Sequence, residues 1–401
     1  MKCVMLAAGE GKRMHPLTST RPKVMLPIAN KPLLEWNLIH ARDAGVKEFL
    51  FILSYKAEIV RSYFKDGSDW DVSIRYINQG KPLGTGHAVG VSESFVDDVL
   101  VFCGDTVFGT NDIIELMKHE NSMGLFTVEN PQQYGVVETK DDSVVRIHEK
   151  MQNPLSHVIN TGGYHFSHDI FKYIEQLKPS VRREYELTDA INEMAMHHTV
   201  RAVNMDSWFD VCYPWDLLDA QRQLLSSIMP HQDSTVEEHV NIKGPVCIGA
   251  STIVRSGSYI EGPVCIGNHC SIGPNCHIRP YTSIGNGCHV GNACEIKNSI
   301  IMSTSKIPHH NYVGDSIIGE GCNLGSGTKI ANLRLDKQPI SVVHRGMRIS
   351  TGRRKLGVIM GDNVETGINA MINTGSIIGD SVFIGPGAIV SGEVLSGSRY
   401  Y

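Results

Sequence analysis

The chain has 401 residues, of which 41% are apolar and 20% charged, and its formal net charge is −5. This length predicts two or three domains, and the composition excludes disorder as the main state. The acidic balance does not favour binding to nucleic acid. No apolar run reaches eighteen residues and the apolar start is short, so neither a membrane span nor a cleaved leader is predicted. We therefore expect a cytoplasmic protein whose ten cysteines are thiols.

The first half of the chain alternates between strand and helix patterns. The expected strands are 2–7, 49–53, 72–77 and 99–103, and the expected helices are 33–44, 57–64, 86–94 and 214–228. This order is typical of an α/β, Rossmann-like domain with a mostly parallel sheet and helices on both faces, and we place it at residues 1–228. Ligands bind such sheets at the carboxyl ends of the strands.

A glycine-rich turn follows the first expected strand, at Gly9-Glu10-Gly11-Lys12-Arg13. Met14 stands where a dinucleotide-binding fingerprint needs glycine, and Arg13 stands where a Walker A motif needs serine or threonine. What remains is a turn with two cations, whose backbone N–H groups suit a triphosphate. A purely structural turn stays open as an alternative.

Other residues of this half extend the pattern. Arg21-Pro22-Lys23 adds cations, and Gln79 with the segment 83–88 offers groups that suit a base and a ribose. Asp105 directly follows an apolar strand, where an oxygen ligand of Mg²⁺ would lie. The alternative for Asp105 is a helix cap.

The second half repeats every six residues. Stepping by six from Ile242 to Ile296 meets only isoleucine and valine. This period predicts a parallel β-helix over 241–395, with three short strands in each coil and glycine at positive-φ corners, after a linker at 229–240. Five cysteines fall at the small positions of the repeat, where we expect buried side chains and no metal: Cys270, Cys276, Cys288, Cys294 and Cys322.

The six-residue phase breaks twice. The segments 302–312 and 331–356 do not fit the coil, so both are expected to leave it as loops, and loops on a rigid scaffold often carry sites. The first contains His309 and His310, and the second contains Asn332, Lys337 and several other basic residues. Solvated excursions without a function stay open as an alternative.

Six motifs, read together, resemble one enzyme family. The motifs are LAAGEGKRM, RPK, LGTGHA, CGD, Asn160-Thr161-Gly162 and Tyr185-Glu186-Leu187-Thr188-Asp189. They resemble those of the sugar-1-phosphate nucleotidylyltransferases. Together with the hexapeptide repeats and the motif His309-His310-Asn311-Tyr312-Val313-Gly314-Asp315, residues 1–395 resemble the bifunctional N-acetylglucosamine-1-phosphate uridylyltransferase/glucosamine-1-phosphate acetyltransferases, in their archaeal form. The resemblance implies a left-handed β-helix.

The resemblance implies a role for individual residues of the first half. The triphosphate would be held by Gly9, Gly11, Arg13 and Lys23, with Arg13 and Lys23 as the catalytic cations. Base and ribose would contact Gln79, Gly84 and Thr85. The sugar phosphate would be bound by Gly135, Glu149, Lys150, Asn160 and Thr161. Mg²⁺ would be bound by Asp105 and Asp210.

Roles are implied for the second half as well. His309, placed three residues before Tyr312, would be the general base that takes a proton from the amine as it attacks acetyl-CoA. The amino sugar and its phosphate would contact Arg279, Lys297, Tyr312, Asn323, Asn332 and Lys337. Acetyl-CoA would lie near Ser326, Ile368 and Pro386. The flat faces of a β-helix and its two loops favour closure by symmetry, so we expect a homotrimer.

Two departures from the family leave the substrates open. Lys12 replaces a usual threonine, and the segment around Asp210 is similar to that of glucose-1-phosphate thymidylyltransferases, so UTP and dTTP both remain. Two alternative functions also remain: a nucleotidylyltransferase whose β-helix only regulates or oligomerises, and a nonenzymatic sugar-nucleotide sensor.

Overall fold

The computed structural model describes all 401 residues and divides them into two compact units, each described by itself below. The first unit consists of Met1–Glu10, Pro22–Met25 and Pro32–Asp210, and the second of Gly11–Arg21, Leu26–Lys31 and Val211–Tyr401. None of the helices combines the length and the apolar character that crossing a membrane requires.

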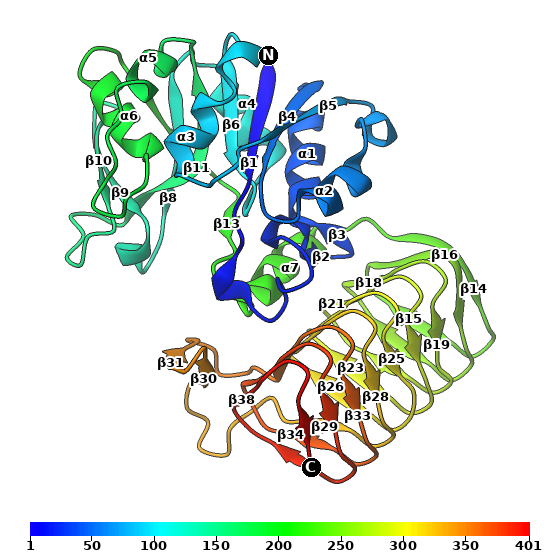
Figure 1. Cartoon of the computed structure of the whole chain (residues 1–401). Helices are drawn as coiled ribbons and strands as arrows, with labels where there is room; N and C mark the ends of the chain where they lie inside the picture. The colour runs from blue at the N-terminus through cyan, green and yellow to red at the C-terminus, as the bar shows by residue number, and fades with distance from the viewer. The chain divides into compact units, whose positions relative to one another are not determined.

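A nine-stranded sheet forms the centre of the first unit (Figure 1). Its order is β5 (Ser73–Asn78), β4 (Glu48–Leu53), β1 (Lys2–Ala7), β6 (Val99–Cys103), β11 (Val158–Phe166), β8 (Ser122–Thr127), β12 (Arg201–Asn204), β10 (Ser143–Glu149) and β9 (Gly135–Lys140). The first four strands are parallel, as predicted. Beyond β6, however, β11 runs antiparallel to both of its neighbours, and β9 and β10 form a hairpin. The turn of that hairpin is Asp141-Asp142, both with positive φ, which matches the twist of an antiparallel pair.

Helices cover both faces of this sheet. The helices are α1 (Leu33–Asp43), α2 (Ala57–Phe64), α3 (Thr85–Gly90), α4 (Thr110–Met117), α5 (Ile170–Ile174) and α6 (Leu187–Ala195). Successive side chains of β1 alternate between the faces: Cys3 and Met5 pack with α1, α2 and α4, whereas Val4 packs with α3, α5 and α6. A short ribbon of β7 (Thr106–Phe108) and β13 (Trp208–Asp210) lies outside the sheet.

The second unit contains α7 (Asp216–Ser226) and a parallel β-helix with three strands per coil. One face consists of β15 (Asn241–Lys243), β17 (Tyr259–Glu261), β20 (His277–Ile278), β23 (Glu295–Lys297), β26 (Tyr312–Gly314), β29 (Lys329–Ile330), β34 (Met371–Ile372) and β37 (Ile389–Val390). A second face consists of β16 (Val246–Val254), β18 (Val264–Ile266), β21 (Thr282–Ile284), β24 (Ile300–Ile301), β27 (Ile317–Ile318), β32 (Val358–Met360), β35 (Ser376–Ile378) and β38 (Glu393–Val394). The third continues from β16 through β19 (Ser271–Ile272), β22 (His289–Val290), β25 (Lys306–Ile307), β28 (Asn323–Leu324), β33 (Glu365–Thr366), β36 (Phe383–Ile384) and β39 (Arg399–Tyr400).

The segment that we predicted as a linker contributes to this β-helix. Strand β14 (His231–Val236) pairs in parallel with β16, and Val236 and Val240 pack against the apolar core. The prediction failed there because the Pro, His and acidic residues of this segment do not give the apolar pattern of a strand. The outward side chains of a short edge strand need not be apolar.

The interior of the β-helix confirms the six-residue repeat. The isoleucines and valines at every sixth position from Ile248 to Ile296 are at most 2% exposed. The five repeat cysteines are buried free thiols, and they donate to carbonyl oxygens of the next coil: Cys276 Sγ lies 2.8 Å from Gly291 O. Thr252 makes the same bond to Gly267 O at 2.7 Å. The cysteines therefore act as small donors in a narrow core.

The structure confirms glycine at several positive-φ corners: Gly257, Gly287, Gly321, Gly327 and Gly387 have φ between 67° and 77°. Among the glycines that directly follow the repeat aliphatic residues (Gly249, Gly267, Gly273, Gly285 and Gly291), however, only Gly273 has a positive φ. The others are needed for close approach between coils: a Cβ on Gly249 would lie 2.2 Å from Asn268 Oδ1, and one on Gly291 would lie 1.7 Å from Pro308 O. Other positive-φ corners are occupied by residues such as Asn275.

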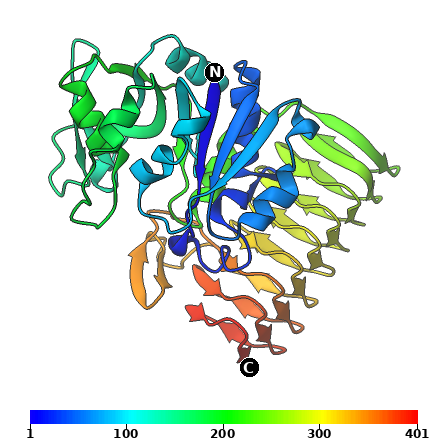
Figure 2. The same cartoon turned by 45° about the horizontal axis from the view of Figure 1, so that its top comes forward.

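The two phase breaks have different causes. Residues 302–312 do not leave the coil, contrary to our prediction: they include β25, which pairs with β22. The phase shifts because Ile266 pairs with Ile284, whereas Ile284 pairs with Ile301, one residue sooner, so a corner has been shortened. The second prediction is confirmed, because residues 331–356 leave the coil and form the antiparallel hairpin β30 (Ser341–His344) and β31 (Met347–Ser350), orange in Figure 2.

Candidate active sites

Two acidic side chains and a lysine lie together in the first unit. Lys23 Nζ is 2.7 Å from Asp105 Oδ2, and Lys23 is buried. Asp105 follows β6, and the ribbon of β7 and β13 pairs Thr106 with Asp210. Burial raises the pKa of the Cys103 thiol, and the charges of Asp105 and Asp210 raise it further. Both carboxylates therefore lie close to the same sulfur atom.

These carboxylates fit a magnesium ion. Mg²⁺ prefers hard oxygen ligands, and it is commonly held by one or two carboxylates together with substrate phosphates and water. Asp105 and Asp210 supply that number, and the adjacent Lys23 adds a positive charge for the same phosphates.

Glycines determine the backbone near this edge of the sheet. Gly104 N donates to Leu6 O at 2.9 Å, and a Cβ on Gly104 would lie 2.8 Å from that oxygen. The segment 83–86 pairs with Tyr185 through backbone hydrogen bonds of 2.8 Å, and a Cβ on Gly84 (φ 119°) would lie 2.5 Å from Tyr185 O. Two of the recognised motifs are thus neighbours in space.

The polar residues expected to bind the nucleotide have partners within the fold. Gln79 Nε2 donates to Gly84 O at 3.2 Å and lies 3.0 Å from His87 Nδ1. Thr85 Oγ1 accepts from Leu187 N at 3.1 Å, so this hydroxyl ties α3 to the start of α6.

The expected sugar residues come from β9, β10 and β11. Gly135 lies opposite Glu149 in the hairpin register, and Thr188 Oγ1 donates to Glu149 Oε1 at 3.1 Å. Asn160 Nδ2 donates to the Tyr164 hydroxyl at 2.6 Å. Thr161 is 2% exposed and its hydroxyl donates to Gly124 O, so its side chain packs beneath the surface. Lys150 has a positive φ at the end of β10.

Several residues of the glycine-rich turn belong to the second unit. Gly11 has a left-handed φ of 71° and begins a short helical turn. The Arg13 guanidinium lies 5.6 Å from the centre of the Tyr213 ring. Arg21, which we grouped with the phosphate-binding cations, instead pairs with Asp362 and with Glu320 at 2.9 Å. Gly9 lies in the first unit, and a Cβ there would meet no atom within 4 Å.

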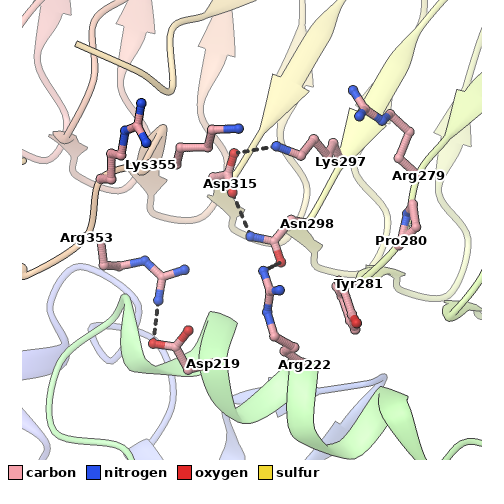
Figure 3. A pocket seen from close by; sticks show the side chains of 11 residues that line it. Asp219, Arg222, Arg279, Pro280, Tyr281, Lys297, Asn298, Asp315, Arg353 and Lys355 are labelled. Carbon is pink, nitrogen blue, oxygen red and sulfur yellow. Dashed lines mark hydrogen bonds and ion pairs between the residues drawn. The ribbon is translucent and has the colours of Figure 1, made fainter. Parts of the chain in front are cut away.

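A strongly basic pocket of about 570 Å³ lies in the second unit (Figure 3). It is lined by Asp219, Arg222, Arg279, Pro280, Tyr281, Lys297, Asn298, Asp315, Arg353, Arg354 and Lys355. The nearby charge of Lys297 lowers the pKa of Lys355, so the two ammonium groups lie close together in the pocket. Three cations of the pocket have acidic partners: Arg279 pairs with Glu295 at 2.8 Å, Lys297 with Asp315 at 3.4 Å, and Arg353 with Asp219.

The pocket contains two of the predicted residues and several that we did not predict. Arg279 and Lys297 line it, whereas Lys337 does not. Lys355 takes the place that we expected for Lys337, at the opposite end of the excursion. Arg222 and Asp219 come from α7, and the Arg222 guanidinium lies 4.4 Å from the Tyr281 ring centre. Nothing in a repeat pattern indicates a contribution from α7.

Asp315 lies at the centre of this pocket's hydrogen bonds. It is 4% exposed and accepts from Asn332 Nδ2 at 2.6 Å and from Asn298 Nδ2 at 2.7 Å, with Lys297 Nζ at 3.4 Å. Asn332 Nδ2 also lies 3.2 Å from the Tyr312 hydroxyl. The structure therefore places Tyr312 and Asn332 beside Asp315, although neither of them lines the pocket itself.

His309 lies elsewhere on the coil. It precedes β26, whereas Asp315 follows the same strand. His309 and His310 are both exposed. Burial lowers the pKa of His289, and the nearby His309 lowers it further, which places the two histidines on neighbouring coils. Asn323 lies on β28, opposite Lys306 of β25.

The three residues expected to contact acetyl-CoA form one column. Asn369 N donates to Ser326 O at 2.8 Å, and Gly387 N donates to Ile368 O at 2.9 Å, so Ser326, Ile368 and the Pro386 corner stack on successive coils. Ile368 is 59% exposed. Ile368 and Pro386 are exposed apolar side chains of this column, which suit the apolar part of a long ligand.

Comparisons with known proteins also distinguish an N-terminal part of the chain from a C-terminal part. Residues 2–227 match the nucleotidyl transferase family model, and residues 260–397 match the model of the GMPPB C-terminal domain. The chain is 41% identical to the bifunctional protein GlmU of Methanocaldococcus jannaschii, over 100% of this chain and 97% of that protein. It is 42% identical to a bifunctional sugar-1-phosphate nucleotidylyltransferase/acetyltransferase of Sulfurisphaera tokodaii, over the full length of both.

A solved structure shows the same fold for the first half. A protein from Bacillus anthracis, described as a glucose-1-phosphate thymidylyltransferase, is 27% identical and superposes with a TM-score of 0.53, covering 58% of this chain and 98% of that one. The full-length similarity to named bifunctional enzymes favours two activities over a nucleotidylyltransferase with a merely regulatory β-helix. The chain therefore belongs to the GlmU family of bifunctional sugar-1-phosphate nucleotidylyltransferase/acetyltransferases.

Proposed function

We propose that the chain acetylates glucosamine 1-phosphate with acetyl-CoA and then joins N-acetylglucosamine 1-phosphate to UTP, releasing pyrophosphate. Residues 1–228 would carry nucleotidyl transfer and residues 241–395 acetyl transfer, with 229–240 between them. The observation that carries the bifunctional assignment is the basic pocket of the β-helix. A purely structural β-helix has no need for six cations around two carboxylates, whereas a phosphorylated substrate does.

The first reaction needs positioning and charge, because the attacking phosphate oxygen is already anionic. Mg²⁺ held by Asp105 and Asp210 would neutralise charge on the triphosphate. Lys23, together with Arg13, would stabilise the charge that develops at the reacting phosphorus. Gly9 and Gly11 would allow the backbone to approach the phosphates. Gln79, Gly84 and Thr85 would contact the base and ribose.

The sugar phosphate of this reaction would lie against the second half of the sheet. Gly135, Glu149, Lys150 and Asn160 are the proposed contacts. The hydrogen bond between Thr188 and Glu149 holds that carboxylate in place. Because the Thr161 hydroxyl is bonded to Gly124 O, we assign Thr161 to the support of β11 beneath this site.

In the second reaction the amine must lose a proton as it attacks the thioester. We propose His309 as the base, since histidine is suited to this near neutral pH. Arg279, Lys297 and Lys355 would hold the phosphate, and Tyr312 and Asn332 the amino sugar. Acetyl-CoA would lie along Ser326, Ile368 and Pro386. Asn323 and Lys337 remain proposed contacts outside the pocket.

We further propose that the active form is a homotrimer. The seven residues from His309 to Asp315 can span up to about 20 Å, whereas the amine and the phosphate of the substrate sit on adjacent sugar carbons. A base and a phosphate pocket at opposite ends of β26 are brought to one substrate by a neighbouring copy. Exposed apolar side chains on the last coils, such as Met371 and Ile389, support such contacts.

The test is an assay of pyrophosphate release with Mg²⁺ across nucleoside triphosphates and sugar 1-phosphates, with free-thiol release from acetyl-CoA measured in parallel. UTP with N-acetylglucosamine 1-phosphate should give the highest kcat/KM, and glucosamine 1-phosphate should release thiol. A preference for dTTP with glucose 1-phosphate, without thiol release for any amino sugar, would support the single-activity alternative instead.

A further inference from the structure

We propose that Asp315 is a positioning residue of the acetyl-transfer site: it fixes the side-chain amide of Asn332 so that the amide oxygen faces the substrate amino group. This inference rests on the proposed acetyl transfer. It concerns a residue that would act through Asn332.

The position of Asp315 is set by the shortened corner of the coil. Asp315 follows β26 with a positive φ of 50°, and Asn298 takes the equivalent place one coil earlier with a φ of 45°. Asp315 N donates to Lys297 O at 2.9 Å, which fixes the backbone of the corner. The carboxylate is 4% exposed and points into the pocket (Figure 3).

The neighbours of Asp315 are hydrogen-bond donors, so both oxygens of its side chain must act as acceptors. Oδ1 accepts from Asn298 and Oδ2 from Asn332, while Lys297 adds a third donor. An ionised carboxylate only accepts hydrogen bonds, so it satisfies all three donors. An asparagine in its place would turn one N–H₂ group toward another and leave a buried donor without a partner.

The hydrogen bonds of Asn332 show what this arrangement achieves. Its Nδ2 is directed to Asp315 at 2.6 Å and to the Tyr312 hydroxyl at 3.2 Å, which occupies both of its N–H groups. The amide oxygen is then the group that remains for a ligand. An amine donates to such an oxygen, and this contact directs its lone pair away from Asn332 and toward an electrophile.

The negative charge of Asp315 allows a positioning role to be distinguished from a role in binding the substrate phosphate. Asp315 Oδ2 lies 3.4 Å from Lys297 Nζ, and the charge of Lys297 also acts on Lys355. Removing the negative charge makes the pocket more positive, so the phosphate should bind at least as well. The orientation of Asn332 should be lost at the same time. The proposal therefore predicts a fall in kcat without a rise in KM for the sugar phosphate.

The first experiment compares Asp315→Asn with wild type and with Asp233→Asn, a matched change at an exposed position of β14. Asp315→Asn should lower kcat for thiol release at least tenfold, leave KM for glucosamine 1-phosphate unchanged or lower, and leave pyrophosphate release unchanged. In the Asn332→Ala background, Asp315→Asn should cost no further kcat, since it acts through Asn332. Wild-type kcat in Asp315→Asn, a raised KM, or additive losses would overturn the proposal.

A second variant keeps the proposal testable if Asp315→Asn does not fold. Asn332→Asp places two carboxylates side by side, and their repulsion favours a shared proton. The protonated pair again offers a donor to Asp315 and a carbonyl oxygen to the ligand. Its kcat, as a ratio to wild type, should therefore rise as pH falls from 8 to 6. A ratio that stays constant with pH would contradict the proposal. Absence of thiol release in wild type would instead remove the acetyl-transfer assignment itself.

Discussion

The ammonium group of Lys23 lies 2.7 Å from Asp105 Oδ2, and β13 holds Asp210 beside the same end of β6. The lysine comes from a segment far earlier in the chain than either acid. This arrangement joins a cation to the two carboxylates that we propose as magnesium ligands. It makes Asp105 the residue on which nucleotidyl transfer should depend most.

Replacing Asp105 with asparagine should therefore separate the two activities. Loss of a charged metal ligand should cost several kcal/mol of transition-state stabilisation, or roughly a hundredfold to a thousandfold in kcat. Pyrophosphate release at saturating Mg²⁺ measures this loss, while thiol release should stay within about threefold of wild type. Asp142→Asn, at an exposed residue paired with Arg201, serves as the control. Near-normal pyrophosphate release by Asp105→Asn would show that Asp105 is only structural.

His309→Ala should lower acetyl transfer by about 10²–10⁴-fold, the usual cost of losing a general base. His310 is its neighbour but has a left-handed φ of 54°, which turns its side chain in another direction. His310→Ala should thus cost far less. Free-thiol release from acetyl-CoA, followed in both variants as pH is varied, compares them directly. Equal losses, or a larger loss for His310→Ala, would reassign the base.

If the acetyl-transfer site is shared between two copies of the chain, two inactive variants should restore activity when they assemble together. His309→Ala and Lys297→Ala should each be inactive in thiol release when purified alone. Co-expressed in equal amounts, they should recover about a quarter of wild-type activity, because one interface in four combines an intact pocket with an intact histidine from its neighbour. Mixed assemblies without any recovered activity would show that both residues act within one chain.

The five buried repeat cysteines should resist thiol reagents. Burial raises the pKa of Cys276, Cys288 and Cys322 to about 12. At pH 8 their reactive thiolate fraction is then only about 10⁻⁴. A thiol reagent such as Ellman's should react with part-exposed Cys247 in the native protein and with all ten cysteines after unfolding. Rapid native labelling of Cys276 would contradict this.

The same shift gives stability a definite pH dependence. Above about pH 9 these thiols ionise in the unfolded chain but not in the folded one, so the unfolded state binds fewer protons. The free energy of unfolding should consequently fall as pH rises through 9. Urea unfolding at pH 8 and pH 10 measures this fall, and a rise would contradict it.

The sequence predicted best what local periodicity determines. Strands β1 and β6, helix α2 and the column from Ile248 to Ile296 follow from hydrophobic pattern alone. The antiparallel half of the first sheet was missed, because pairing between distant strands leaves no local signal. The break at Met302 was visible but misread: removing one residue from a corner shifts the phase as a loop would, yet it keeps the coil.

The same limit applies to the sites. Asp105 and Lys23 were predicted because motifs mark them, and Arg279 and Lys297 because the family resemblance implies them. Asp219 and Arg222 of α7 were not, since only tertiary packing brings them to the pocket. Lys337 was predicted from the family resemblance, whereas Lys355 was not, because the sequence does not show that the excursion brings its far end back to the coil.

The most direct test of two activities in one chain uses a single mixture of purified protein, Mg²⁺, UTP, acetyl-CoA and glucosamine 1-phosphate. Products are followed by mass spectrometry, together with thiol and pyrophosphate. The proposed function predicts UDP-N-acetylglucosamine, with one thiol and one pyrophosphate released for each product molecule. Accumulation of unacetylated UDP-glucosamine, or pyrophosphate release without thiol, would contradict it.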